Sequence, residues 1–377
     1  MDRNSTDEAY QEQILQHVSR TFALTIPQLP PALRISVTNA YLLCRIADTI
    51  EDQTASSAAA RLGLLHRFVA VLCGGEDAAQ LARDLLPRLS EHTLSAEREL
   101  ILNMGRVVRL TATLPAAQRT AIERCVRVMC DGMHQFQCIA SRDGLARLVD
   151  LDDYCYYVAG VVGEMLTQLF CDHAPGIERQ RAGLERLCVS FAQGLQMTNI
   201  LKDVWEDRER GACWLPQEIF SRHGVELRAV QSGQQSRGFD AGMRELVGIA
   251  HAHLRDALSF TLLIPRGEAG IRRFCLWAIG MAVLTLRRIV HTPGFAAGKQ
   301  VKISHTAVAL TQLLSNAAVR QDGLLRRLFA LTAAGLPLAT LGAYVPPGRR
   351  ASEVRAADPA ASHAPQRDLR REGSSGR

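Results

Sequence analysis

The chain has almost no lysine. Of its 44 basic residues only three are lysines, Lys202, Lys299 and Lys302, and the others are arginines. Aromatic residues are also scarce, at 5% of the 377 residues. Residues 348–377 hold seven arginines against four acidic residues, so this stretch carries half of the net charge of +6 and the rest is nearly neutral. Nucleic-acid binding needs a clustered basic face, so this distribution argues against a nucleic-acid partner.

Several structural signals are missing as well. No alternating apolar and polar segments flank hairpin turns, none of the ten cysteines forms a C-x-x-C pair, and the polar N-terminus has no secretory signal. Apolar residues instead recur at three- and four-residue steps, as at Leu15, Val18, Phe22 and Ile26. We therefore expect an all-α protein of roughly ten or more helices, with free thiols, in the cytoplasm.

No linker separates two halves of different composition, so we expect a single domain over residues 1–347. Residues 328–347 carry no charge, and we expect them to form an apolar last helix. This length could span a bilayer, but Gly335, Pro337 and Gly342 lower its hydrophobicity. A core helix or a segment lying on a membrane surface is therefore favoured over a span. Residues 348–377 are expected to be disordered.

The first group of chemical interest lies in residues 45–52. Asp48 and Asp52 are four residues apart, so on a helix their carboxylates share one face, with Glu51 beside it and Arg45 one turn earlier. Like charges at this spacing destabilise a helix, which suggests that a cation lies between them. Carboxylate oxygens suit Mg²⁺, which typically binds one or two carboxylates together with substrate phosphates. The alternative is a solvated acidic helix end.

The second group lies in residues 196–207. Asn199, Asp203 and Asp207 follow one another at four-residue steps, and Gln196 precedes Asn199 by three, which makes one polar stripe. Such a stripe is either the solvent face of an amphipathic helix or the wall of a cavity. The repeated carboxylate spacing favours the cavity. Two such helices could hold two or three Mg²⁺ ions on a diphosphate, and aliphatic walls could hold a hydrocarbon.

Together these motifs resemble the squalene/phytoene synthase family of head-to-head prenyltransferases. The resemblance runs from about Ser19 to about Lys302 and includes four segments in the family's order: Ser19-Arg20-Thr21-Phe22, residues 41–52 from Tyr41 to Asp52, residues 154–163 (YCYYVAGVVG), and residues 196–207. It implies an isoprenoid-synthase helical bundle around one central cavity. Its implied metal ligands are Asp48, Glu51, Asp52, Asn199, Asp203 and Asp207.

The resemblance also implies the reaction. One allylic diphosphate ionises, the double bond of a second attacks the cation, and loss of a proton leaves a cyclopropylcarbinyl diphosphate. Squalene synthases then reduce this intermediate with NADPH. Tyr154 matches the family tyrosine that is proposed to transfer a proton near the diphosphate. The other implied catalytic residues are Asp48, Asp52, Asp203 and Asp207. The implied substrate contacts are Ser19, Arg20, Phe22, Tyr41, Arg45, Val158, Gly163, Gln196 and Asn199. The small residues 158–163 leave room for a chain; close packing between helices is the alternative.

The length of the chain and the segment Val301-Lys302-Ile303 favour squalene synthase within this family. The three lysines lie in or beside functional motifs, so Lys202, Lys299 and Lys302 are the expected contacts to NADPH. Ser304-His305 departs from the Arg-Lys of the eukaryotic pattern and weakens the NADPH assignment. After Asp207 the family often has an arginine near position 212, and Arg208 or Arg210 could substitute for it.

We therefore expect a squalene synthase, which converts two farnesyl diphosphates to squalene with Mg²⁺ and NADPH. The nearest alternative is a non-reducing member that stops at presqualene diphosphate or makes dehydrosqualene, hydroxysqualene or phytoene. A terpene cyclase would carry a different second motif, and a dead partner protein would have broken aspartate motifs. We expect a monomer, with peripheral membrane contact as a further expectation because the product is a hydrocarbon.

Overall fold

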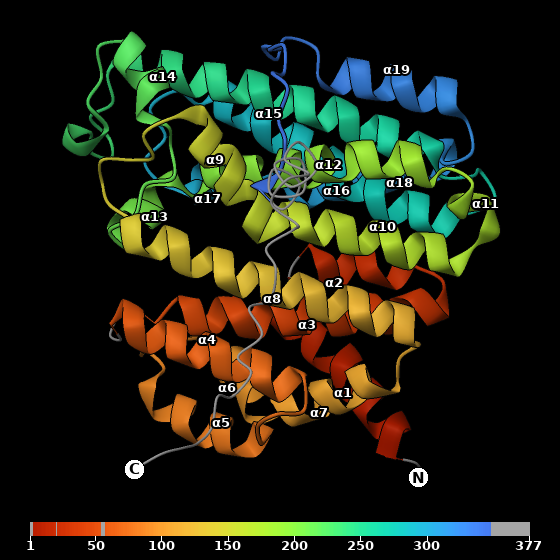
Figure 1. Ribbon diagram of the computed structural model, residues 1–377. Helices are drawn as coiled ribbons and strands as arrows, with labels where there is room; N and C mark the ends of the chain where they lie inside the picture. Colours follow the sequence, from red (N-terminus) through yellow and green to blue (C-terminus); the bar gives the residue numbers. More distant parts are fainter. Residues whose placement is uncertain (1–2, 20, 54–56, 348–377) are drawn as a thin grey trace, which may run out of the picture. The chain divides into compact units, whose positions relative to one another are not determined.

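The computed structural model describes residues 3–19, 21–53 and 57–347. Within these residues the regular secondary structure is helical, without a β-strand, and Leu145 and Pro216 form one isolated β-bridge. Figure 1 shows the helices stacked against one another along their lengths. The predicted all-α class is confirmed.

The helices of the first half are α1 (Arg3–Val18), α2 (Phe22–Thr25), η1 (Ile26–Gln28), α3 (Pro31–Glu51), α4 (Ala58–Leu72), α5 (Ala78–Leu85), η2 (Leu86–Arg88), α6 (Ser95–Leu102), α7 (Met104–Thr113), α8 (Ala116–Ile139), α9 (Leu148–Cys155), η3 (Tyr156–Gly160) and α10 (Val161–His173). Those of the second half are α11 (Pro175–Glu178), α12 (Arg181–Lys202), α13 (Val204–Glu209), α14 (Gln217–Arg222), η4 (Leu227–Ala229), α15 (Arg237–Leu263), α16 (Ala269–His291), α17 (Gly298–Val301), α18 (His305–Ala318) and α19 (Asp322–Thr332).

Helix boundaries follow local signals in the sequence. Pro31 opens α3, where the missing N–H of proline costs nothing and its fixed φ suits a helix. Ser236 caps α15 by accepting a hydrogen bond of 3.2 Å from the N–H of Phe239. Ser304 caps α18 in the same way, from the N–H of Ala307 at 3.2 Å.

The core of the fold is the packing of α12 against α15. Helix α12 also contacts α10, α16 and the π-helical segment η3, while α3, α4 and α8 pack together and meet α10. Gly194 permits the close approach of α12 and α15, because a Cβ there would lie 3.1 Å from the backbone nitrogen of Leu254. This arrangement places the C-terminal ends of α3 and α12, which carry the two acidic motifs, on the walls of one cavity.

The end of the bundle differs from the expected helix over residues 328–347. Helix α19 ends at Thr332, and residues 336–346 have no regular secondary structure. Gly335 takes a left-handed backbone conformation (φ +82°), and Pro337 cannot continue a helix. The segment instead lies along α15: Ala339 donates its N–H to Gly248 O at 3.1 Å, and Pro337 O is bonded to the ring of His251.

One helix in the described part of the chain is long and apolar enough to cross a membrane, by length and composition alone. It is α16, and 72% of its most apolar window is buried within the protein. That degree of burial is typical of a core helix, so α16 is weak evidence for a membrane span.

The first compact unit of the chain ends at Gly342. The first unit ends five residues before the expected boundary at 347. The single catalytic domain over residues 1–347 stays a prediction. The disorder predicted for 348–377 concerns residues outside those described.

Candidate active site

The first acidic motif occupies the last turn of α3. The carboxylate of Asp48 lies 3.8 Å from the guanidinium of Arg45, which in turn is hydrogen-bonded to Glu97 of α6. Asp52 caps the helix by donating its N–H to Asp48 O at 2.9 Å. The predicted sharing of one helix face is therefore found, and Glu97 is an unforeseen member of the group.

Burial and neighbouring negative charges raise the pKa of two of these carboxylates. The pKa of Asp48 is raised to about 7 and that of Glu51 to about 8; burial is the main cause, and neighbouring carboxylates contribute to both shifts. Asp48 is still 38% accessible, so an ion from solution can reach it. The carboxylates of this motif outnumber the basic side chains beside them, and a divalent cation would neutralise the remaining negative charge.

The second motif lies where α12 meets α13. The stripe is not one continuous helix as expected, because the chain breaks at Asp203, which ends α12 and precedes α13. Asp203 accepts a hydrogen bond of 2.6 Å from Lys202, and Asp207 accepts one of 2.6 Å from Arg210. Burial is again the main cause that raises the pKa of Asp207, here to about 6.

Tyr154 projects from the end of α9, just before the π-helical turn η3. A π-helical turn is rare and often marks a functional site. The Tyr154 ring stacks on Trp214 with centroids 4.1 Å apart and planes 10° from parallel, and the edge of Phe136 meets it at 5.2 Å. Burial and the charges of Glu51 and Asp207 raise its pKa well above the usual value, so the hydroxyl stays protonated at neutral pH.

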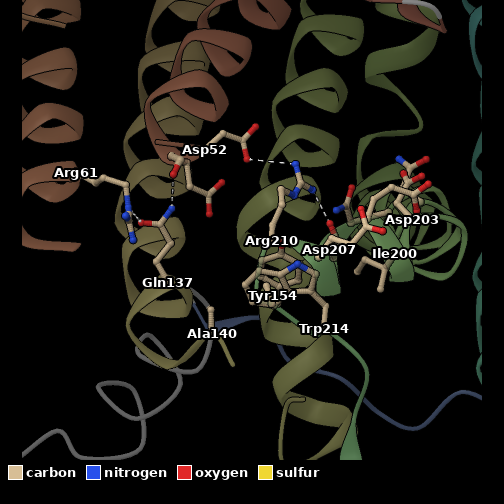
Figure 2. A pocket seen from close by; sticks show the side chains of 16 residues that line it. Asp52, Arg61, Gln137, Ala140, Tyr154, Ile200, Asp203, Asp207, Arg210 and Trp214 are labelled. Carbon is tan, nitrogen blue, oxygen red and sulfur yellow. Dashed lines mark hydrogen bonds and ion pairs between the residues drawn. The ribbon is translucent and has the colours of Figure 1, made fainter. Parts of the chain in front are cut away.

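These elements enclose one cavity of about 820 Å³ (Figure 2). Six carboxylates and two guanidiniums are among its lining residues, which are Glu51, Asp52, Arg61, Gln137, Ala140, Tyr154, Gln196, Asn199, Ile200, Asp203, Glu206, Asp207, Glu209, Arg210, Ala212 and Trp214. The walls are thus more polar than the aliphatic lining expected. A small apolar cavity lies apart from it, between α10, α12, α15 and α16, and Phe191 and Phe274 are among its lining residues.

The donor set fits Mg²⁺, because carboxylate and amide oxygens are the ligands that this ion prefers. Among the residues that the structure describes, no three His, Cys, Asp or Glu side chains converge closely enough to hold a metal alone. Oxygens from a bound anion would have to complete the coordination. An acidic cavity needs a metal to attract such an anion, so the two ligands depend on each other.

The N-terminal motif does not line this cavity. Ser19 accepts a hydrogen bond of 3.0 Å from the N–H of Phe22, and the Phe22 ring lies 5.2 Å from that of Tyr41. The Tyr41 hydroxyl donates to Val18 O at 3.1 Å. In the described structure these contacts join α3 to α2 and to the end of α1, and Arg20 falls outside the described residues.

The small residues of segment 158–163 allow close packing between helices, which was the alternative to room for a substrate chain. A Cβ on Gly163 would lie 2.3 Å from the carbonyl oxygen of Cys188, so α10 and α12 touch there. Gly163 borders the small apolar cavity, and neither it nor Val158 is among the residues that line the acidic one.

The lysine segment adjoins the second motif through Gly298. Its N–H donates to Glu206 at 2.8 Å, and a Cβ there would lie 2.9 Å from Lys202 O. Lys299 and Lys302 follow it and are exposed, so their ammonium groups are accessible to an anionic ligand such as the 2′-phosphate of NADPH. The ammonium of Lys202 is paired with Asp203, and its contact with NADPH stays a prediction.

The sequence did not decide whether Arg208 or Arg210 substitutes for the family arginine near position 212. In the structure these two arginines have different contacts. Arg208 is buried and donates to Leu227 O and Val230 O, both at 2.8 Å, so it holds the loop in place. Arg210 lines the cavity. Trp214, Arg61 and Gln137 were missed, because an aromatic residue in a loop and polar residues on separate helices carry no spacing signal.

The fold and the site define a class: an all-α protein built around one acidic cavity with a carboxylate motif on each of two helices. The chain belongs to the squalene/phytoene synthase family, whose model matches residues 15–307.

Curated relatives agree with this assignment. The chain is 31% identical over 286 residues to a squalene synthase of Solanum lycopersicum, covering 72% of this chain and 62% of the relative. It is 31% identical over 289 residues to squalene synthase 10 of Panax ginseng, covering 74% of this chain and 63% of the relative. The match thus spans somewhat under two thirds of these relatives.

Solved structures share the fold. TcSQS in complex with the ligand BPH1237 superposes with a TM-score of 0.70 at 23% identity, covering 93% of this chain and 97% of that one. A dehydrosqualene synthase in complex with a ligand gives a TM-score of 0.56 at 23% identity, covering 84% and 98%. At these identities the likeness concerns the fold alone.

Proposed function

We propose that this protein is a squalene synthase, which condenses two farnesyl diphosphates through presqualene diphosphate and reduces the product to squalene with NADPH. One observation carries the proposal: Tyr154 and residues of both acidic motifs line the same cavity. Relatives named squalene synthase support the same reading.

Mg²⁺ is the proposed metal. Asp48, Asp52, Asp203 and Asp207 would hold it, with Glu51 and Asn199 close enough in sequence to complete the two motifs. When bound, the metal would neutralise the diphosphate and so make it a better leaving group. The excess of carboxylates over guanidiniums in the cavity supports this role, since the walls alone would repel a diphosphate.

The chain's own groups would guide the organic part of the substrate. Tyr154 and Trp214 present a stacked aromatic pair at the cavity, and aromatic faces attract a cation such as an allylic carbocation. The protonated Tyr154 hydroxyl makes no hydrogen bond within the described part of the chain, so it is available to a diphosphate oxygen or to the departing proton. Gln196 would contact the substrate from the opposite helix, and Arg45 and Glu97 would position Asp48.

The reductive step separates this proposal from its alternative, a non-reducing enzyme that releases dehydrosqualene or a related product. Lys299 and Lys302 would hold NADPH. Ser304 here caps α18 instead of supplying a basic group, which leaves fewer cations than the eukaryotic pattern. The test is to incubate the protein with farnesyl diphosphate and Mg²⁺, with and without NADPH, and to identify the products. Squalene that appears only with NADPH supports the proposal, and an unchanged product favours the alternative.

We also propose a cytoplasmic monomer with peripheral membrane contact near α19. Leu331 and Leu338 are 70% and 50% exposed, and Arg326 and Arg327 lie close by in the sequence. Exposed leucines beside arginines suit the interface of a membrane with anionic lipids. Co-sedimentation with vesicles of phosphatidylcholine and phosphatidylglycerol tests this contact, and a protein that stays in the supernatant contradicts it.

A further inference from the structure

Each of the four aspartates that would hold the metal already has a cation of the same chain beside it. Asp48 is 3.8 Å from Arg45, and Asp203 is bonded to Lys202 at 2.6 Å. Asp52 and Asp207 share one partner, Arg210, at 3.7 and 2.6 Å. Figure 2 shows Arg210 between the two carboxylates, one from each motif.

Arg210 differs from the other arginines of this region in what it contacts. The partners of Arg208 are backbone carbonyls, and Arg61 donates to Gln137 at 2.7 Å and to Gln53 O at 3.1 Å. The contacts of Arg210 are carboxylates of the two motifs.

Arg210 is also placed where it can move. Its side chain is 55% exposed, and it follows the last residue of the short helix α13. The next residue, Gly211, has a left-handed backbone (φ +88°) with no atom near the position of its Cβ. A flexible side chain at such a helix end can leave its partners without disturbing the packing around it.

We propose that Arg210 is a displaceable counter-ion that makes metal binding and diphosphate binding depend on each other. This inference rests on the proposed function. A metal alone would have to displace the guanidinium from Asp52 and Asp207 and leave it without a partner. A metal that arrives with a diphosphate offers the displaced guanidinium a new anion, to which it can bond in bidentate fashion. The protein therefore takes up little metal until the substrate is present.

Energetic coupling between two ligands is reciprocal, so it can be measured from the metal side. The experiment determines the dissociation constant of Mn²⁺, by electron paramagnetic resonance or calorimetry, with and without inorganic pyrophosphate. It compares the wild-type protein with Arg210→Gln. Arg61→Gln is the matched control, because it removes the same charge from the same cavity, and Arg61 is hydrogen-bonded to Gln137 and to Gln53 O. Circular dichroism confirms that each variant is folded.

We expect Arg210→Gln to bind Mn²⁺ alone more tightly than both the wild type and Arg61→Gln. The factor by which pyrophosphate tightens Mn²⁺ binding should fall by roughly 5- to 10-fold in this variant. In Arg61→Gln that factor should equal the wild-type one. Arg210→Lys should lie between wild type and Arg210→Gln, because an ammonium keeps the charge but lacks the two separate nitrogens that Arg210 directs at Asp52 and Asp207.

An Arg210→Gln protein with the wild-type coupling factor, or with the same Mn²⁺ affinity as Arg61→Gln, would overturn the inference and leave the proposed function intact. A wild-type protein that binds no Mn²⁺ even with pyrophosphate would contradict the proposed metal site and this inference together.

Discussion

The backbone N–H of Gly298 donates a hydrogen bond of 2.8 Å to the carboxylate of Glu206, and so joins the lysine segment to the second acidic motif. Because a Cβ on Gly298 would lie 2.9 Å from Lys202 O and 3.0 Å from Asp203 Oδ1, we expect Gly298→Ala to push α17 away from the motif. The cost should be about 1–3 kcal/mol of stability together with weaker Mn²⁺ binding. Chemical denaturation and Mn²⁺ titration measure both.

The control is Gly323→Ala, where no atom lies within 4 Å of the added Cβ. This substitution should leave the free energy of unfolding and the Mn²⁺ affinity near wild type. Equal behaviour of the two variants would show that the contact at Gly298 does not organise the motif.

Tyr154→Phe tests the proposed role of one hydroxyl. The ring would keep its stacking on Trp214, and the hydroxyl makes no hydrogen bond in the described structure, so the melting temperature should change little. Turnover should fall by about 100-fold or more, as expected when a group that positions or transfers a proton is lost. Tyr156→Phe is the control, because its hydroxyl is directed at Glu164, 3.4 Å away, and its turnover should stay near wild type. Wild-type turnover in Tyr154→Phe would remove this hydroxyl from the mechanism.

The sequence predicted those features of the fold and the site that depend on residues close together in the chain. The helical period and the four-residue spacing of Asp48 and Asp52 are local, and the structure has both. The contact of Arg45 with Glu97 and the stacking of Trp214 on Tyr154 join residues far apart in the chain, so spacing could not indicate them. The helix expected over residues 328–347 was wrong because apolar composition outweighed the stop at Gly335 and Pro337.

Asp48→Asn and Asp203→Asn each remove one charge from a different motif. Turnover should fall by about 100-fold or more in both, and raising the Mg²⁺ concentration should restore part of it, because the remaining carboxylates bind the metal more weakly. Asp84→Asn is the control: this residue forms a partly exposed ion pair with Arg67 at 2.8 Å, away from both motifs, and ion pairs near the surface contribute little. Full turnover in either Asp48→Asn or Asp203→Asn would contradict the metal assignment.

His253 of α15 gives the fold a pH dependence that is independent of the cavity. Its ring nitrogen lies 2.7 Å from Ser190 Oγ, which donates to Asp256 at 2.8 Å, and burial lowers its pKa to about 4. The unfolded chain takes up a proton near pH 6.5, before the folded one does. Stability from this group is therefore present above pH 6.5 and lost as the pH falls toward 4.

Between pH 7 and pH 5 the loss should be on the order of 2 kcal/mol. Other groups titrate in the same range, so the measurement is the difference between wild type and His253→Asn, in which the amide replaces the ring nitrogen without a titrating group. The denaturation curves of the variant should lack this part of the acid sensitivity. An identical pH dependence in the two proteins would show that His253 is not held neutral.

We propose that the two acidic motifs and Tyr154 form one metal-dependent site for joining two prenyl diphosphates. The most direct measurement is the conversion of radiolabelled farnesyl diphosphate by the purified protein, with Mg²⁺ and with EDTA, followed by separation of C30 products and presqualene diphosphate. We expect a C30 product or presqualene diphosphate with Mg²⁺ and none with EDTA. Unchanged farnesyl diphosphate in the presence of Mg²⁺, or a product that forms equally well in EDTA, would contradict it.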